Sequence, residues 1–412
     1  MKAIVRISMA ALGLVALACS RPVDEADKSI YNEAAYDKSD GSPMAPGGAD
    51  DYGGGSGGSG GGQGVGGEAG VITAAEWNDL VNWDFWGGLM TGEYSGMNTY
   101  WGLSTSKRVA VKAVDSEGNP VPCLPVKLLS GDKCHWQAVT DNKGEANLWL
   151  AVTNIQETVS VADCRIEING VEQSDAPLLW AWDAKEPVVN EYTVAPNASL
   201  SNTVDIAFIV DATGSMGDEI AFLKSDLQSI LEKVSQMETD RTVFTGTVFY
   251  RDADGDEYLT RYSPFTTDIS STMAFIGQQY ADGGGDTPEA VHTALEAALT
   301  DLQWHSSAYS KMAFLILDAP AHVDHVGVIA SLQNSIAEFA AKGIKVIPVF
   351  CSSYEKECEF MCRQFAILTG GTYVFLTNDS GVGGDHIEAT VGSYQVEHLN
   401  TLIVRLITKY IQ

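Results

Sequence analysis

Residues 203–219, which read TVDIAFIVDATGSMGDE, decide the fold of the second half of the chain. Ile206–Val210 is a continuous apolar run, typical of a strand that is covered on both faces of a parallel sheet. The run ends at Asp211, and Thr213 and Ser215 follow with a glycine between them. We therefore expect three oxygen-bearing side chains at the carboxyl end of a buried strand, where open α/β sheets bind ligands.

One carboxylate and two hydroxyl groups are hard oxygen donors, which suit Mg²⁺, or alternatively Ca²⁺ or Mn²⁺. The pattern D-x-[ST]-x-S after a buried strand resembles the von Willebrand factor type A (VWA) domain and its metal-ion-dependent adhesion site (MIDAS). The resemblance covers about the last half of the chain, residues 199–412. It implies a Rossmann-like, doubly wound α/β domain with a mostly parallel sheet.

The rest of this half alternates between strand and helix patterns, as a parallel α/β domain requires. Apolar runs predict strands, and apolar residues at helical spacing predict helices. The expected strands are 243–250, 312–318, 344–350 and 372–376, the last of which closes the sheet, and the expected helices are 220–234, 288–299, 329–339 and 396–410.

Two further loops complete the expected metal site. They are GGGDTPEA (283–290) and LDAPAH (317–322), each at the end of a strand or the start of a helix. In the VWA family the second loop gives a Thr or an acidic ligand, and the third loop gives an Asp. Because DTPE resembles the integrin β-subunit version, the resemblance implies Glu289 as a ligand, with Thr287 as the alternative. Asp318 is implied to act through a water.

Mg²⁺ prefers six oxygens in octahedral geometry and keeps several waters. The ligand set implied by the resemblance leaves one position open for a carboxylate from a partner protein. The structural alternative is that these side chains are only acidic loop and helix-cap residues.

Three neighbouring acids are possible further metal residues. Asp218 and Glu219 fall where integrin β subunits carry an adjacent regulatory metal site, and Asp286 matches another accessory-ion residue of those subunits. The favoured alternative for Asp218 and Glu219 is that acids in the first turn of a helix stabilise its dipole.

Two other polar patterns carry weaker signals. DADGDE (252–257) lacks the spacing of an EF-hand loop, so we expect an exposed acidic hairpin turn. His322 and His325 flank Asp324, but without a third imidazole or an HExxH helix they are a poor catalytic zinc site. We expect these histidines to pack or cap the loop. The chain has no G-x-S-x-G elbow or P-loop.

The N-terminus predicts export. Residues 1–18 have a basic start and a short apolar stretch, as in a signal peptide. VALAC, which ends at Cys19, resembles the lipobox of bacterial lipoproteins, and Ser20 resembles outer-membrane sorting. The alternative is an ordinary secretory signal that is cleaved near residue 18. Residues 19–70, with a Gly-rich tract, predict a disordered tether that links the lipid to the folded part.

The middle of the chain predicts a second folded region. Residues 71–105 form an aromatic-rich connecting segment, in which TAAE (73–76) is typical of a capping box that opens a helix. Its aromatic residues are expected to pack, with sugar stacking as the alternative. Residues 106–198 alternate short strands and turns, including an Asn-Gly hairpin signal. DSEGNPVPCLPVKLL and AVTDNKGEANLWL resemble a carboxypeptidase regulatory-like β-sandwich.

Composition limits the function. The chain has 412 residues and a net charge of −29, which argues against nucleic-acid binding. Six cysteines remain besides Cys19, and their pairing cannot be read from the sequence. We expect a cell-envelope lipoprotein, held to the membrane by lipid, whose VWA domain binds a protein partner through the ion in adhesion or assembly. The alternatives are a metal-assisted hydrolase and a non-catalytic scaffold; we do not expect an enzyme.

Overall fold

The computed structural model describes residues 67–412, except 155, 238, 253–255, 286, 354 and 383–387. The predicted signal peptide, the lipidation of Cys19, nearly all of the tether and the possible metal residue Asp286 lie outside the described residues. None of the described helices is long and apolar enough to cross a membrane.

The apolar run of residues 206–210 lies inside β9 (Thr203–Asp211), near the middle of the main sheet. The described part of the chain gives this sheet eight strands in the order β11-β10-β9-β12-β13-β14-β1-β15. The other seven strands are β1 (Thr73–Trp77), β10 (Thr242–Tyr250), β11 (Thr260–Thr266), β12 (Ser310–Leu317), β13 (Ile344–Phe350), β14 (Tyr373–Leu376) and β15 (Glu397–His398).

The five central strands, from β10 to β14 in the sheet order, run parallel. β9 pairs with a parallel strand on each side, and its residues 206–210 are buried. Both faces are therefore covered, which explains why the sequence here is continuously apolar rather than alternating. The mostly parallel α/β sheet that the sequence predicts is confirmed.

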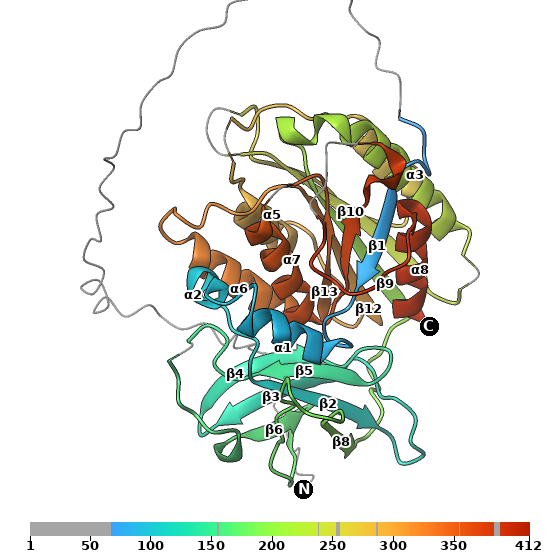
Figure 1. Ribbon diagram of the computed structural model, residues 1–412. Coiled ribbons are helices and arrows are strands. Elements are labelled where there is room, and N and C mark those ends of the chain that lie inside the picture. Colours follow the sequence, from blue (N-terminus) through green and yellow to red (C-terminus); the bar gives the residue numbers. More distant parts are fainter. Residues whose placement is uncertain are drawn as a thin grey trace, which may run out of the picture. The chain divides into compact units, whose positions relative to one another are not determined.

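Helices cover both faces of the sheet (Figure 1). One buried cluster joins α3 (Ile220–Ser235), α4 (Ile269–Gly277) and α8 (Leu399–Ile411) to alternate residues of β9. The other cluster joins α5 (Val291–Thr300), α6 (Val328–Ala341) and α7 (Lys356–Thr369) to the remaining residues of that strand. The sheet is thus doubly wound.

β1 corrects the prediction that the TAAE pattern opens a helix. Residues 73–77 form a strand that pairs antiparallel with β14, with Ala75 opposite Phe375. The hydroxyl of Thr377 donates to that of Thr73 at 2.8 Å, so the Thr belongs to a strand pair and not to a helix cap. β1 and β15 also extend the sheet beyond residues 372–376, which were expected to close it. Long-range pairing outweighs the local capping signal.

Residues 108–193, here called the β module, form two further sheets. β5-β2-β8 has three strands and β4-β3-β6-β7 has four. Asn169 and Gly170 both have positive φ in the turn between β6 and β7, as the Asn-Gly hairpin signal predicts. The bounds are β2 (Arg108–Val114), β3 (Pro125–Ser130), β4 (Lys133–Val139), β5 (Glu145–Trp149), β6 (Arg165–Ile168), β7 (Val171–Glu172) and β8 (Val189–Thr193).

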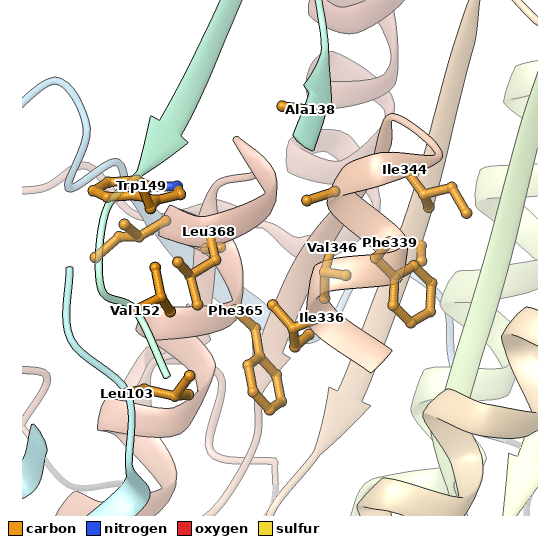
Figure 2. Close-up of a cluster of buried hydrophobic side chains, with 14 of the residues drawn as sticks. Leu103, Ala138, Trp149, Val152, Ile336, Phe339, Ile344, Val346, Phe365 and Leu368 are labelled. Atoms are coloured by element: carbon orange, nitrogen blue, oxygen red, sulfur yellow. The ribbon is translucent and has the colours of Figure 1, made fainter. Parts of the chain in front are cut away.

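The β module shares its hydrophobic core with the α/β domain. Figure 2 shows Trp149, Val152 and Ala138 facing side chains of α6, β13 and α7. These opposing side chains belong to one cluster of buried residues and are Ile336, Phe339, Ile344, Val346, Phe365 and Leu368. The two parts therefore pack as one unit and not as separate domains on a linker.

The aromatic-rich segment takes part in the same core through α1 (Trp83–Thr91) and α2 (Met97–Trp101). The rings of Trp86 and Tyr94 pack on Phe360 of α7, with centroids 6.0 and 5.4 Å away. Both side chains are fully buried, so these aromatic residues pack rather than form an exposed platform. Five of the cysteines in the described part of the chain, Cys123, Cys164, Cys351, Cys358 and Cys362, are free thiols.

Candidate metal centre

The two strand-end carboxylates lie side by side at the carboxyl edge of the sheet. Asp211 is the last residue of β9, and Asp318 directly follows β12. The two strands are paired through Val210 and Ile316, so the chain directions carry both carboxylates to the same edge. This is the edge at which parallel α/β sheets bind ligands.

The first loop gathers the hydroxyl groups around Asp211. The Thr213 N–H and hydroxyl donate to Asp211 Oδ1 at 2.9 and 2.7 Å. The Thr213 and Ser215 hydroxyls lie 3.1 Å apart, and Ser215 is in the short 3₁₀ helix η3 (Gly214–Asp218). The three oxygen-bearing side chains expected from the sequence are thus brought together.

Backbone hydrogen bonds hold the second loop (283–290) between the first and third loops of the site. Gly214 N–H donates to the carbonyl of Gly283 at 3.1 Å, and Glu289 N–H donates to that of Pro320 at 2.9 Å. A Cβ atom on Gly214 would lie 2.8 Å from the Gly283 oxygen, so only glycine allows this close approach. Glu289 is thereby held against the third loop.

Each of the three carboxylates keeps one buried oxygen without a hydrogen-bond partner. Asp211, Glu289 and Asp318 are 0%, 2% and 6% exposed. The unpartnered atoms are Asp211 Oδ2, Glu289 Oε2 and Asp318 Oδ1. Buried polar atoms without partners are rare, and each calls for a ligand, water or ion.

Burial and the charges of neighbouring carboxylates raise the pKa of all three carboxyl groups. Burial is the main cause for each, and it raises the pKa of Asp211 to about 6, that of Asp318 to about 7 and that of Glu289 to about 9. The charge of Asp211 adds to the shift of both Glu289 and Asp318. Three ionised carboxylates in one buried site therefore need a compensating cation.

These residues fit a hard divalent cation. The unpartnered oxygens are carboxylate oxygens, the nearby hydroxyls add further oxygen donors, and neither thiol nor imidazole is part of the set. Asp211, Thr213, Ser215 and Glu289 would hold the ion, with Asp318 beside it.

The other predicted residues differ in position. Thr287 and Asp218 are exposed. Glu219 is buried and accepts hydrogen bonds from the backbone N–H and the hydroxyl of Ser352, which follows β13. Its charge also raises the pKa of Asp318, after the effects of burial and Asp211. Glu219 is therefore part of the acidic cluster and links it to the end of β13.

Asp252 also belongs to this site, although its sequence motif predicts an exposed turn. It is buried rather than in an exposed turn, and its Oδ1 lies 3.0 Å from Nε2 of His322. Its charge contributes to the raised pKa of Glu289. The ring of His322 also stacks on that of His325, with centroids 4.5 Å apart. The only sequence signal was that Asp252 closely follows the apolar end of β10.

Residues 205–381 match the family of the von Willebrand factor A domain. This part of the chain is a VWA domain. The match begins within β9 and includes all three metal-site loops. β1 and α8 lie outside the matched residues, although β1 completes the sheet and α8 covers one of its faces.

Two curated proteins are similar to parts of the chain. A putative ariadne-like RING finger protein of Acanthamoeba polyphaga mimivirus is 35% identical over 111 residues, 26% of this chain and 11% of that protein. The alpha-protein kinase vwkA of Dictyostelium discoideum is 29% identical over 122 residues, 30% of this chain and 19% of the kinase. The chain thus spans only a small part of the length of these relatives.

One similar solved structure is proximal thread matrix protein 1 from the mussel byssus, with a zinc-occupied MIDAS motif. It is 14% identical, covers 39% of this chain and 39% of its own, and has a TM-score of 0.31.

Proposed function

We propose that the chain is a cell-envelope lipoprotein whose VWA domain binds a carboxylate-bearing protein partner through Mg²⁺ in adhesion or assembly. The observation that carries this proposal is the set of three buried carboxylates, each with an unpartnered oxygen, at the ligand-binding edge of the sheet. Such a set is destabilising without a cation and complementary to one.

The chemistry of the site favours an acidic partner. A divalent cation, when bound, supplies a positive centre that attracts an anionic oxygen. Ser215 is exposed beside the buried Asp211, so the site opens to solvent on the side of the first loop. A partner carboxylate would reach the site there, and the surrounding acids would disfavour its approach in the absence of the ion.

Calorimetric titration of the full chain with Mg²⁺ tests the metal site. Asp211→Asn keeps the shape of the side chain but removes its charge. It is expected to weaken Mg²⁺ binding by more than the ~10–100-fold typical of an outer-shell change. Asp318→Ala is expected to act in the same direction. Glu232→Ala on the exposed face of α3 is the matched control and should bind as wild type does. Equal affinity of Asp211→Asn and wild type would contradict the proposal.

Partner binding has its own test. Proteins co-purified from the native membrane with the wild-type chain in Mg²⁺ are compared with those retained after chelation. We expect the partner to be lost on chelation and with Asp211→Asn, and retained with Glu232→Ala. If the set of co-purified proteins is unchanged by chelation and by Asp211→Asn, the result would support the scaffold alternative instead.

The lipid anchor is part of the same proposal. It is motivated by the basic and apolar residues 1–18, which end at VALAC. Radiolabelled palmitate should enter the wild-type chain but not Cys19→Ala in a bacterial host. Incorporation into both chains would exclude Cys19 as the lipidated residue.

The proposal assigns no catalytic step. A metal-assisted hydrolase needs a general base within reach of the metal-bound water. His322 is the nearby imidazole, but its Nε2 is engaged by Asp252 and its ring is stacked on His325. These contacts favour a packing role for His322.

A further inference from the structure

A cleft of about 640 Å³ lies where the β module meets the amino ends of β12 and β13. Its lining includes residues of β2 and β8 on one side, and residues 308–311, Lys345 and the end of α8 on the other. The metal centre is at the opposite edge of the sheet, because Lys311 and Asp318 are roughly 23 Å apart along β12 at ~3.3 Å per residue. The cleft is therefore a separate site, and its volume suits a small molecule.

Basic residues gather in this cleft although the chain is strongly acidic. Six basic and three acidic residues line it, whereas the whole chain has 25 Lys and Arg against 54 Asp and Glu. The lining thus reverses the charge balance of the protein. The six basic residues are Arg108, Lys112, Lys143, Lys311, Lys345 and Lys409.

The three acidic residues of the lining interact with only three of the six basic residues. Two acids form ion pairs, Glu191 with Lys112 at 3.6 Å and Asp141 with Lys345 at 3.2 Å. The third, Glu145, acts on the guanidinium of Arg108 through its charge. Within the described part of the chain, the ammonium groups of Lys143, Lys311 and Lys409 have neither an ion pair nor a hydrogen-bond acceptor.

Lys311 is the buried member of these three cations, whereas Lys143 and Lys409 are exposed. The side chain of Lys311 lines the cleft, is only 6% exposed and has no acceptor. Asp205 lies opposite it on β9, but both oxygens of Asp205 are taken by the backbone N–H and the ring of His305, each at 2.7 Å. Burial lowers the pKa of Lys311, whereas the nearby Cys123 and the charge of Asp205 act in the opposite direction, so Asp205 compensates the ammonium group only in part.

Lys143 and Lys409 form a second positive centre on the same cleft. Partial burial lowers the pKa of the Lys409 ammonium; the charge of Glu76 raises it, and those of Lys143, Arg405 and Lys345 lower it further. The Asn142 amide donates to the Lys409 carbonyl at 3.0 Å, which holds the loop of the β module against α8. The cations of the lining therefore come from both the β module and the α/β domain.

We propose that this cleft binds a small organic polyanion whose oxyanion groups meet Lys143, Lys311 and Lys409. Its body lies against the aromatic part of the lining, which consists of Trp180, Tyr309 and Tyr410. Carboxylate, sulfate and phosphate groups share the required chemistry, since an ammonium group binds each of them as a point charge.

Calorimetry of the full chain with citrate and with pyrophosphate tests the proposal. The chain is first stripped of metal with a chelator and then dialysed into metal-free buffer, so neither the metal centre nor the chelator contributes to binding. We expect at least one probe to bind, and the tighter one identifies carboxylate or phosphate as the preferred group. Lys311→Met keeps the apolar stem and is expected to weaken binding by about tenfold or more, as does loss of a hydrogen bond to a charged group. Lys233→Met, on the exposed face of α3, changes the net charge equally and should bind as wild type does.

Labelling provides a second readout that does not depend on a buried variant. Citrate or pyrophosphate should slow acylation of Lys143 and Lys409 but leave that of Lys233 unchanged, as measured by mass spectrometry. The proposal is overturned if neither probe binds at a concentration on the order of 10 mM. A dissociation constant of this size corresponds to a free energy of binding of only ~3 kcal/mol. Equal affinity of Lys311→Met and Lys233→Met would overturn the proposal as well. Neither result would bear on Mg²⁺ binding at Asp211.

Discussion

Asp79 and Arg363 form a doubly hydrogen-bonded ion pair in the interior. Nε and Nη2 of Arg363 donate to the two carboxylate oxygens of Asp79 at 3.0 and 2.6 Å. Both side chains are fully buried. Burial alone would lower the pKa of Arg363, but Asp79 raises it above its ordinary value. The pair joins the segment after β1 to α7, so it connects the two ends of the folded chain.

Removing Asp79 should be strongly destabilising, because the buried guanidinium of Arg363 loses both of these hydrogen bonds and keeps only Glu359, 3.6 Å from its Nη1, as an ion-pair partner among the described residues. Asp79→Ala is expected to lower the free energy of unfolding by about 3–5 kcal/mol. Urea denaturation of the full chain measures this loss. The double variant Asp79→Ala/Arg363→Met should recover part of it, since the guanidinium is then absent and Glu359 keeps its ion pair with Lys356 at 3.4 Å. A loss below about 1 kcal/mol, the value typical of an exposed pair, would show that the pair is not compensating a buried charge.

Apart from Glu289, which the family resemblance of the DTPE loop implied, the sequence predicted residues of the metal centre only where they are close in the chain or follow an apolar strand. Asp211, Thr213 and Ser215 lie within five residues, and Asp318 ends a second buried run. The contact between Asp252 and His322 spans 70 residues and has no local pattern. Asp252 and His322 were assigned to separate loops because neither loop sequence indicates a contact with the other loop.

At the scale of elements, the central strands were predictable because burial on both faces leaves a continuous apolar run. β1 was not, because TAAEW has no such run and starts with a good helix cap. Its state is set by β14, which lies about 300 residues away in sequence and offers an unpaired edge. The local secondary-structure propensity of a segment has little influence on its conformation when an unpaired strand edge is available to it.

Because β1 pairs with β14, any stable fragment of the VWA domain should include β1. A chain that begins at Asn202 lacks β1, so the edge of β14 and part of the α8-covered core are exposed. We expect such a fragment to aggregate or to lose its cooperative thermal transition. A chain of residues 67–412 should be monomeric and unfold cooperatively, as measured by size-exclusion chromatography and circular dichroism.

Complementation distinguishes loss of β1 from any other effect of truncation. Co-expression of residues 67–201 with residues 202–412 should restore a soluble complex, because the missing strand is supplied in trans. A fragment from Asn202 that is soluble and fully folded by itself would contradict the role given to β1.

At the scale of the whole molecule, the two proposed ligand sites lie at opposite edges of one sheet and have opposite charge. The acidic carboxyl edge suits a cation, and the basic amino edge faces the β module. The module is held there by the shared apolar core and by the ion pair between Asp141 and Lys345 at 3.2 Å. This pair is mostly buried, so the docking of the two parts has an electrostatic component.

The pH dependence of stability should report this docking. Burial tends to raise the pKa of Asp141, but Lys345 and the backbone donors of residues 143 and 145 lower it below its ordinary value. The stabilisation by this charge is therefore complete above the unfolded pKa of about 3.9 and is lost as the pH falls through the lower folded pKa.

Asp141→Asn keeps a side-chain oxygen that accepts hydrogen bonds from the turn but lacks the charge. We expect it to lower the free energy of unfolding by about 1–3 kcal/mol at pH 7. The difference from wild type should shrink below about pH 4. Glu172→Gln, in an exposed pair with Arg165, should change stability little at any pH. A difference for Asp141→Asn that stays constant from neutral to acidic pH would show that the charge of Asp141 does not hold the module in place.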